Sequence, residues 1–339
     1  MPVSELAKIA KAMVAPGKGI LAADESAPTI KKRFDSIHVE STEQNRLAYR
    51  EMLFTTKGAE EFISGVILFD ETIRQKASNG AAIPELLSSK GILPGIKVDK
   101  GAKDLALAPG EKVTEGLDGL RERVAEYRQL GARFAKWRAV INIGGGIPSD
   151  GCIGVNAHAL ARYAALCVEG DLVPIVEPEV IMDGPHTIER CHEVTERTLA
   201  AVFAELREQR VPLNEIILKP NMVLSGSTCP TQASVRQVAE ATLACFRKTI
   251  PDEMPGIVFL SGGQSDELAT AHLNEMNKIG GGPWELSFSY GRALQAAPLK
   301  AWAGSAANMP AAQKAYLHRA RCNGAARSGN YTEKMERAA

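Results

Sequence analysis

Eight short apolar runs, nearly all ending in a charged or hydroxyl residue, constrain the fold of this chain more than any other feature. The runs are GILAAD near residue 20, GVILF near 67, GIKV near 97, ARFAKW near 135, VPIVEPE near 176, EIILKP near 217, GIVFLSGG near 259 and ELSFSYG near 288. They recur at intervals of roughly 30 to 45 residues, and segments between them, such as GLDGLRERVAEYRQLGA, have helical periodicity. A repeated strand–helix–strand pattern predicts parallel strands joined by crossover helices.

Eight such units predict an α/β fold, a (β/α)8 TIM barrel with an N-terminal helical extension and a flexible C-terminal tail, since such barrels typically need about 250 residues. We expect residues 1–322 to form one barrel domain with terminal helices. Residues 323–339 are small and polar, so we expect a mobile tail there. A doubly wound open sheet is the alternative, but polar groups at the ends of many strands favour the barrel.

The balance of charges argues against two classes of partner. Forty Lys and Arg residues match forty Asp and Glu residues, so net charge indicates neither a nucleic-acid nor a membrane surface. The N-terminus lacks the apolar core of a signal peptide, and no stretch approaches the roughly 20 apolar residues of a membrane helix. We therefore expect a cytoplasmic protein whose six scattered cysteines are reduced and mostly buried.

Three lysines in these runs could act as a nucleophile: Lys97, Lys136 and Lys219. A lysine in an apolar strand must be paired or neutralised, and burial with a second cation nearby favours the neutral amine. A neutral lysine attacks carbonyls and forms a Schiff base, which then serves as an electron sink. Lys219 has the most apolar run before it and is the first candidate, although each lysine could instead form only a salt bridge.

Carboxylates and glycines complete the candidate chemistry. Glu177 and Glu179 could transfer the protons that a Schiff base requires, or could only balance the charges of Lys136 and Arg138. The segments Ser261-Gly262-Gly263 and Tyr290-Gly291-Arg292 follow the last two strands, the usual place of the phosphate site in such barrels. We expect no metal site, because the histidines and cysteines lack the spacing of a ligand set.

The segments GKGILAADES, GVILFDET, GIKVDKG, AKWR, VPIVEPE, LKPNMV, FLSGGQS and FSYGRALQ resemble, in order, the signature segments of class I fructose-bisphosphate aldolase, from about residue 5 to residue 331. The resemblance implies a (β/α)8 barrel lyase, usually a homotetramer. It implies reversible cleavage of the phosphorylated ketose fructose 1,6-bisphosphate to dihydroxyacetone phosphate and glyceraldehyde 3-phosphate, in glycolysis and gluconeogenesis. It also implies that no metal or other cofactor takes part.

The same resemblance implies a role for each matching residue. LKPN makes Lys219 the Schiff-base lysine, and VPIVEPE makes Glu177 its general acid/base with Glu179 in support. AADES makes Asp24 the base for the substrate 4-hydroxyl, and AKWR makes Lys136 a catalytic neighbour with Arg138 beside the substrate. The expected phosphate ligands are Ser261, Gly262, Gly263, Gly291 and Arg292 on the dihydroxyacetone side, with Ser26, Arg33 and Lys97 also near the phosphates.

One departure and two alternatives remain. Many relatives end in a tyrosine that assists proton exchange at the enamine, whereas this chain ends at Ala339 and its last tyrosine is Tyr331, to which we do not assign that role. The substrate could instead be fructose 1-phosphate or sedoheptulose 1,7-bisphosphate. A scaffold that binds acidic partners through the basic pocket is the alternative outside catalysis, and the full catalytic set argues against it as the sole role.

Overall fold

All eight predicted strands lie in one closed parallel barrel in the computed structural model, which describes residues 3–337. The barrel strands are β1 (Gly19–Ala23), β2 (Ile63–Leu68), β3 (Leu93–Lys97), β6 (Phe134–Ile141), β7 (Val173–Val180), β8 (Ile217–Leu218), β9 (Gly256–Phe259) and β10 (Glu285–Tyr290). Each strand pairs with its neighbours in chain order, and β10 closes the barrel against β1. The (β/α)8 prediction is therefore confirmed.

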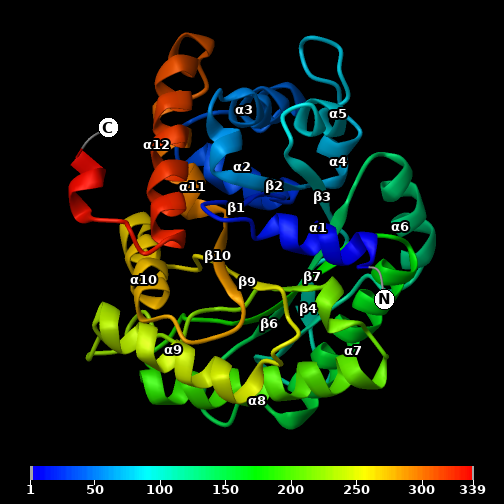
Figure 1. Cartoon of the computed structure of the whole chain (residues 1–339), viewed down its shortest axis with the longest axis vertical. Coiled ribbons are helices and arrows are strands. Elements are labelled where there is room, and N and C mark those ends of the chain that lie inside the picture. The colour runs from blue at the N-terminus through cyan, green and yellow to red at the C-terminus, as the bar shows by residue number, and fades with distance from the viewer. Residues whose placement is uncertain (1–2, 338–339) are drawn as a thin grey trace.

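Helices surround the barrel on its outside (Figure 1). They are α1 (Glu5–Met13), α2 (Ala27–Asp35), α3 (Glu43–Thr55), α4 (Asp70–Ile73), α5 (Ile83–Ser88), α6 (Leu120–Gln129), α7 (Asp150–Glu169), α8 (Ile188–Glu208), α9 (Val235–Thr249), α10 (Asp266–Ile279), α11 (Arg292–Trp302) and α12 (Met309–Arg327). Short 3-10 turns are η1 (Ala59–Glu61), η2 (Leu213–Glu215), η3 (Ala306–Asn308) and η4 (Glu333–Arg337). A small hairpin, β4 (Ala102–Asp104) with β5 (Lys112–Thr114), lies outside the barrel sheet.

The interior of the barrel is filled by side chains, as its sequence requires. Phe134 is fully buried, and a Cβ atom on Gly95 would lie only 2.2 Å from its ring. Because Gly95 on β3 has no side chain, the Phe134 ring fits beside it. Because parallel strands are covered on both faces, their sequences are apolar runs rather than alternating patterns.

Helix α1, the predicted N-terminal extension, closes one end of the barrel (Figure 1). Its buried residues Leu6, Ala10 and Met13 belong to the same cluster as Ile20 and Phe134 of the barrel. The Ser4 hydroxyl accepts a hydrogen bond from the Ala7 backbone N–H and caps the first turn. The opposite end, at which the carboxyl ends of the strands lie, is open to a ligand.

The predicted tail boundary at residue 323 is wrong. Asn323 and Ala326 are buried in helix α12, which continues to Arg327, and Tyr331 beyond the helix is 4% exposed. The reason is steric, since a Cβ atom on Gly324 would lie 2.7 Å from the Phe62 ring. The small residues that suggested a tail are those that let α12 pack closely on the rest of the molecule.

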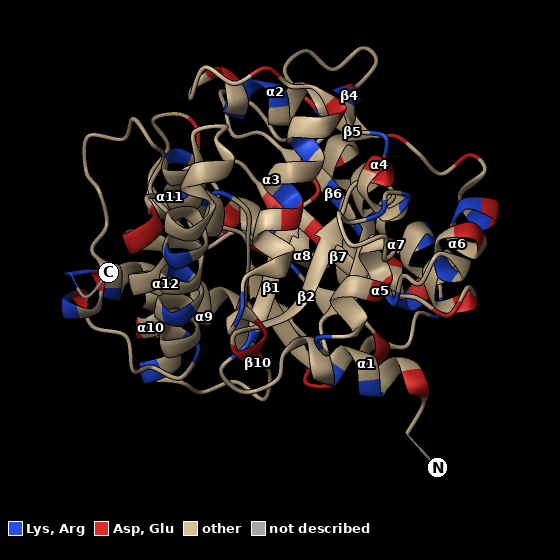
Figure 2. Cartoon of the chain, turned by 90° about the horizontal axis from the view of Figure 1, so that it is seen from above, with Lys and Arg blue, Asp and Glu red and all other residues tan. Residues whose placement is uncertain are grey.

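The helices differ in the charge that they carry. Helix α6 carries both acidic and basic residues, whereas α12 carries basic residues without acidic ones (Figure 2). All six cysteines lie among the described residues, and each is free and buried. Among residues 3–337, no helix combines the length and apolar character needed to cross a membrane.

Candidate active site

One large cavity of about 1430 Å³ lies at the carboxyl ends of the barrel strands. The candidate residues that line it are Asp24, Ser26, Arg33, Lys97, Lys136, Arg138, Glu177, Glu179, Lys219, Ser261, Gly262, Gly291 and Arg292. Gly263 is not among the lining residues, and its backbone N–H donates to the Met182 sulfur atom at 3.0 Å. The structure thus brings together all the predicted site residues except Gly263.

Two lysines and a glutamate form the buried centre of this cavity. Glu177 lies on β7 between Lys136 of β6 and Lys219, which directly follows β8. Its Oε1 atom is 3.2 Å from Lys219 Nζ, and its Oε2 atom is 3.3 Å from Lys136 Nζ. All three residues are at most 4% exposed. One carboxylate therefore contacts both amines in a region from which water is largely excluded.

Asp24, directly after β1, adds a second carboxylate to this centre. Its Oδ2 atom is 2.7 Å from Lys136 Nζ. Burial alone would raise the pKa of Asp24, but the charges of Lys136 and Lys219 outweigh burial and lower it to about 2. Burial would likewise lower the pKa of Lys136, but Asp24 and Glu177 raise it above its usual value. Lys136 therefore stays protonated at neutral pH.

The next polar pair along β6 and β7 is Arg138 with Glu179. Arg138 Nε donates to Glu179 Oε2. Burial would lower the pKa of Arg138, but Glu179 raises it above its usual value. Because side chains alternate along a strand, Lys136 and Arg138 point to the same side, as do Glu177 and Glu179. The two pairs therefore form successive polar layers facing the cavity.

The loops after β9 and β10 place a guanidinium group and two glycines at one side of the cavity. Gly262 has a φ of 54°, in the left-handed region that glycine adopts without strain. Arg292, the first residue of α11, donates from Nη2 to the Gly262 carbonyl oxygen. Ser261 and Gly291 line the cavity beside them. A guanidinium group and a glycine-rich turn at this position suit a phosphate group.

A second group of cations lies on the β1 and β3 side of the cavity. Arg33 of α2 pairs with Glu25 at 2.5 Å, and Lys97 pairs with Asp99 at 2.5 Å. Lys97 also donates to the Asp99 carbonyl oxygen at 2.8 Å. Both cations are thus held in place by carboxylates before any ligand binds.

The sequence places Asp99 at a strand end beside Lys97, but it predicted no role in the site for Glu25 or Asp99. Glu25 is 7% exposed, and besides Arg33 it accepts a hydrogen bond from Gln295 Nε2 at 2.8 Å. Asp99 Oδ2 accepts from the backbone N–H of Arg138 at 3.2 Å, which ties β3 to β6. Their positions beside Asp24 and Lys97 at strand ends were the available signal. Thr29 and Lys32 of α2 also line the cavity, but a helix position gave no signal for them.

A comparison with protein families finds one match over nearly the whole chain. The model described as fructose-bisphosphate aldolase class-I matches residues 5–339.

Individual relatives are similar over almost their full length. A Xanthomonas axonopodis pv. citri protein named "Probable fructose-bisphosphate aldolase class 1" is 60% identical over 98% of this chain and 99% of its own length. The cytosolic fructose-bisphosphate aldolase 5 of Arabidopsis thaliana is 55% identical, covering 97% of this chain and 92% of the relative. Among solved structures, fructose-bisphosphate aldolase from Plasmodium falciparum, in complex with TRAP and an inhibitor, superposes with a TM-score of 0.95 at 51% identity, covering 97% of this chain and 95% of that one.

Proposed function

Because this chain belongs to the class I fructose-bisphosphate aldolases, we propose that Lys219 is the residue that forms a Schiff base with the substrate. The enzyme is a lyase that reversibly cleaves fructose 1,6-bisphosphate to dihydroxyacetone phosphate and glyceraldehyde 3-phosphate in glycolysis. The observation that carries the assignment is the buried contact of Lys219 Nζ with Glu177 at 3.2 Å. A nucleophilic amine and its proton-transfer partner are thereby within reach of each other.

Schiff-base formation uses Lys219 and Glu177. The neutral Nζ atom adds to the C2 carbonyl carbon, and the resulting carbinolamine must lose its hydroxyl group as water. Glu177 shuttles the protons of these steps because its carboxylate already contacts the amine. Lys136, held by Asp24 and Glu177, keeps a positive charge beside the nucleophile.

Carbon–carbon cleavage uses Asp24. The carboxylate takes the proton of the C4 hydroxyl, the C3–C4 bond breaks, and its electrons move into the iminium to give an enamine and the free aldehyde. Asp24 is a weak base, because its pKa is about 2. A weak base suffices, since the hydroxyl proton becomes strongly acidic as its oxygen becomes a carbonyl oxygen. Protonation of the enamine at C3 and hydrolysis then release dihydroxyacetone phosphate and restore Lys219.

We leave the donor of the enamine proton unassigned. Tyr331 is not a lining residue of the cavity, and its hydroxyl group donates to Glu336 Oε1 at 2.9 Å. Tyr331 therefore does not donate the enamine proton in this proposal.

The two phosphate groups of the substrate are bound at opposite sides of the cavity in this proposal. Ser261, Gly262, Gly291 and Arg292 bind the phosphate on the dihydroxyacetone side, while Ser26, Arg33 and Lys97 lie near the other. Arg138 contacts the substrate between them, with Glu179 in support.

Two cationic regions favour a bisphosphate over fructose 1-phosphate. Relative kcat/KM values on fructose 1,6-bisphosphate, fructose 1-phosphate and sedoheptulose 1,7-bisphosphate test this preference.

Replacement of the nucleophile tests the proposal. Lys219→Met should abolish cleavage of fructose 1,6-bisphosphate, whereas Lys103→Met, on the exposed hairpin strand β4, should leave kcat unchanged. Retention of cleavage by a folded Lys219→Met protein would overturn the assignment.

Assembly and location are further parts of the proposal. We expect a homotetramer, as the family resemblance implies, and light scattering should give four times the mass of one chain. A cytoplasmic location is supported by the relative named cytosolic in Arabidopsis thaliana, and cell fractionation tests it.

A further inference from the structure

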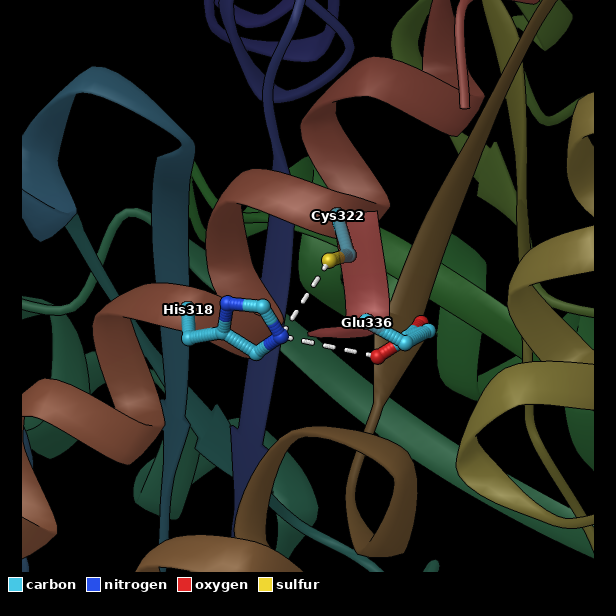
Figure 3. A group of neighbouring side chains, drawn as sticks. All are labelled: His318, Cys322 and Glu336. Carbon is cyan, nitrogen blue, oxygen red and sulfur yellow. Dashed lines mark hydrogen bonds and ion pairs between the residues drawn. The ribbon is translucent and has the colours of Figure 1, made fainter. Parts of the chain in front are cut away.

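Three side chains outside the active site, His318, Cys322 and Glu336, point toward one another near the C-terminus (Figure 3). His318 and Cys322 are four residues apart on helix α12 and therefore share one face of it. Glu336 comes from η4, the turn that follows the helix in the chain. None of the three lines the catalytic cavity.

The contact between His318 and Glu336 is too long for a strong hydrogen bond. His318 Nε2 is 3.5 Å from Glu336 Oε2, whereas N–H···O hydrogen bonds are usually about 2.7–3.2 Å. The same nitrogen is 3.7 Å from the Cys322 sulfur atom. All three potential ligand atoms lie within 4.8 Å of one another.

The two separations that involve His318 fit a tetrahedral metal ion. Zinc binds nitrogen and oxygen at about 2.0–2.2 Å and thiolate sulfur at about 2.3 Å, so adjacent ligand atoms of a tetrahedron are about 3.3–3.6 Å apart. The observed separations of 3.5 Å and 3.7 Å differ from this range by little. Imidazole, thiolate and carboxylate are also the ligand types that zinc prefers.

Two neighbouring residues already orient the carboxylate. Arg319 Nη1 is 2.5 Å from Glu336 Oε2, and the Tyr331 hydroxyl group donates to Glu336 Oε1 at 2.9 Å. Hydrogen bonds to a ligating carboxylate are a regular feature of metal sites and leave a lone pair free on the oxygen. Cys322 is fully buried, while the side chains of His318 and Glu336 are 15% and 18% exposed, which gives an ion access from the surface.

We propose that His318 Nε2, Cys322 Sγ and a carboxylate oxygen of Glu336 bind one divalent ion of the zinc class, with water in the fourth position. On binding, the Cys322 thiol loses its proton to solvent and ligates as thiolate. Because Glu336 belongs to η4 and the other ligands belong to α12, the ion fastens η4 to helix α12. The site is thus structural and separate from the chemistry at Lys219.

Cobalt titration of the full-length protein, treated first with a chelator, tests the site. Wild-type protein should bind one Co²⁺ per chain with a thiolate-to-metal charge-transfer band, and Zn²⁺ should displace the cobalt. Cys322→Ser should abolish the band. His318→Ala and Glu336→Gln should weaken binding at least about tenfold, since even outer partners of metal sites contribute roughly 10- to 100-fold. His192→Ala is the matched control, because His192 on α8 also faces a glutamate, Glu196, four residues away. This variant should bind Co²⁺ as wild type does.

A second measurement follows the segment itself. Zn²⁺ should slow tryptic cleavage after Lys334, within η4, at least about tenfold in wild type and should not slow it in Glu336→Gln, a substitution outside the barrel core. A wild-type titration without a thiolate band would overturn the proposal, as would a Cys322→Ser protein that binds Co²⁺ like wild type. If Zn²⁺ protected Glu336→Gln from trypsin as much as it protects wild type, Glu336 would not be a ligand.

Discussion

Glu177 is the residue on which the two buried amines of the active site depend. Its two carboxylate oxygens contact Lys219 and Lys136 at 3.2 Å and 3.3 Å, and it is 3% exposed. A buried carboxylate beside the protonated amine of Lys136 is stable only as part of the set, because an uncompensated buried charge costs several kcal/mol. The same placement lets it exchange protons with Lys219.

Glu177→Gln tests the proton-transfer role at nearly unchanged volume. We expect kcat for cleavage to fall by about 10²–10⁴-fold, since the amide cannot transfer the protons of carbinolamine dehydration. The control is Glu205→Gln. Glu205 lies on α8 beside His158 of α7, away from the cavity, and its variant should keep wild-type kcat. Steady-state cleavage kinetics measure both, and a Glu177→Gln protein with wild-type kcat would refute the role.

Asp24 should leave a signature in the dependence of stability on pH. Its pKa is about 2 in the folded protein and near 3.8 in a free side chain, so the unfolded chain binds the proton more tightly. The ion pair between Asp24 and Lys136 therefore contributes about 2 kcal/mol to the free energy of unfolding above about pH 4. This contribution is lost as the pH falls toward 2. Chemical denaturation of wild type and Asp24→Asn at pH 5 and pH 3 measures it. The stability difference between the two proteins should be smaller at pH 3, and an unchanged difference would show that the carboxylate is not held by Lys136.

At the scale of single elements, strands were predictable and the last helix was not. Each barrel strand is a short apolar run bounded by polar residues, and parallel strands covered on both faces produce that pattern directly. The end of α12 lacks large apolar residues, so its sequence predicts no packing. Gly324 nevertheless lies against Phe62 and the Gly17 carbonyl oxygen, because a side chain as small as hydrogen permits that approach.

Two glycine-to-alanine substitutions test this account of α12. Gly324→Ala should destabilise the protein by about 1–3 kcal/mol, because the added methyl group would lie 2.7 Å from the Phe62 ring. Gly154→Ala on helix α7 meets no atom within 4 Å and should stabilise by about 0.5–1 kcal/mol through helix propensity. Thermal unfolding of both variants supplies the comparison, and stabilisation by Gly324→Ala would contradict the close packing.

At the scale of the whole molecule, the barrel explains why so much of the site could be predicted. Residues far apart in sequence, such as Asp24 and Lys219, meet because every strand ends at the same rim. The polar strand ends and the glycines that follow the last two strands were therefore sufficient to predict much of the cavity lining, whereas Ser26 and Arg33 were predicted only from the resemblance to the aldolase family. Thr29 and Lys32 could not be found this way, because they reach the cavity from a helix whose position depends on tertiary packing.

The His318–Cys322–Glu336 cluster shows the same limit. Its first two members have a helical spacing that the sequence displays, but the third joins them only through the path of the chain after α12. Ligand sets that combine a helix face with a distant turn are invisible to spacing rules.

The Schiff base at Lys219 is the central claim, and borohydride trapping tests it most directly. The protein is incubated with dihydroxyacetone phosphate, reduced with borohydride, digested and analysed by mass spectrometry. We expect one adduct per chain, on Lys219, because its amine contacts the carboxylate that transfers its protons, whereas the amine of Lys136 is held protonated by Asp24 and Glu177. An adduct on Lys136 or Lys97 in place of Lys219, or no adduct in a protein that cleaves its substrate, would contradict the claim.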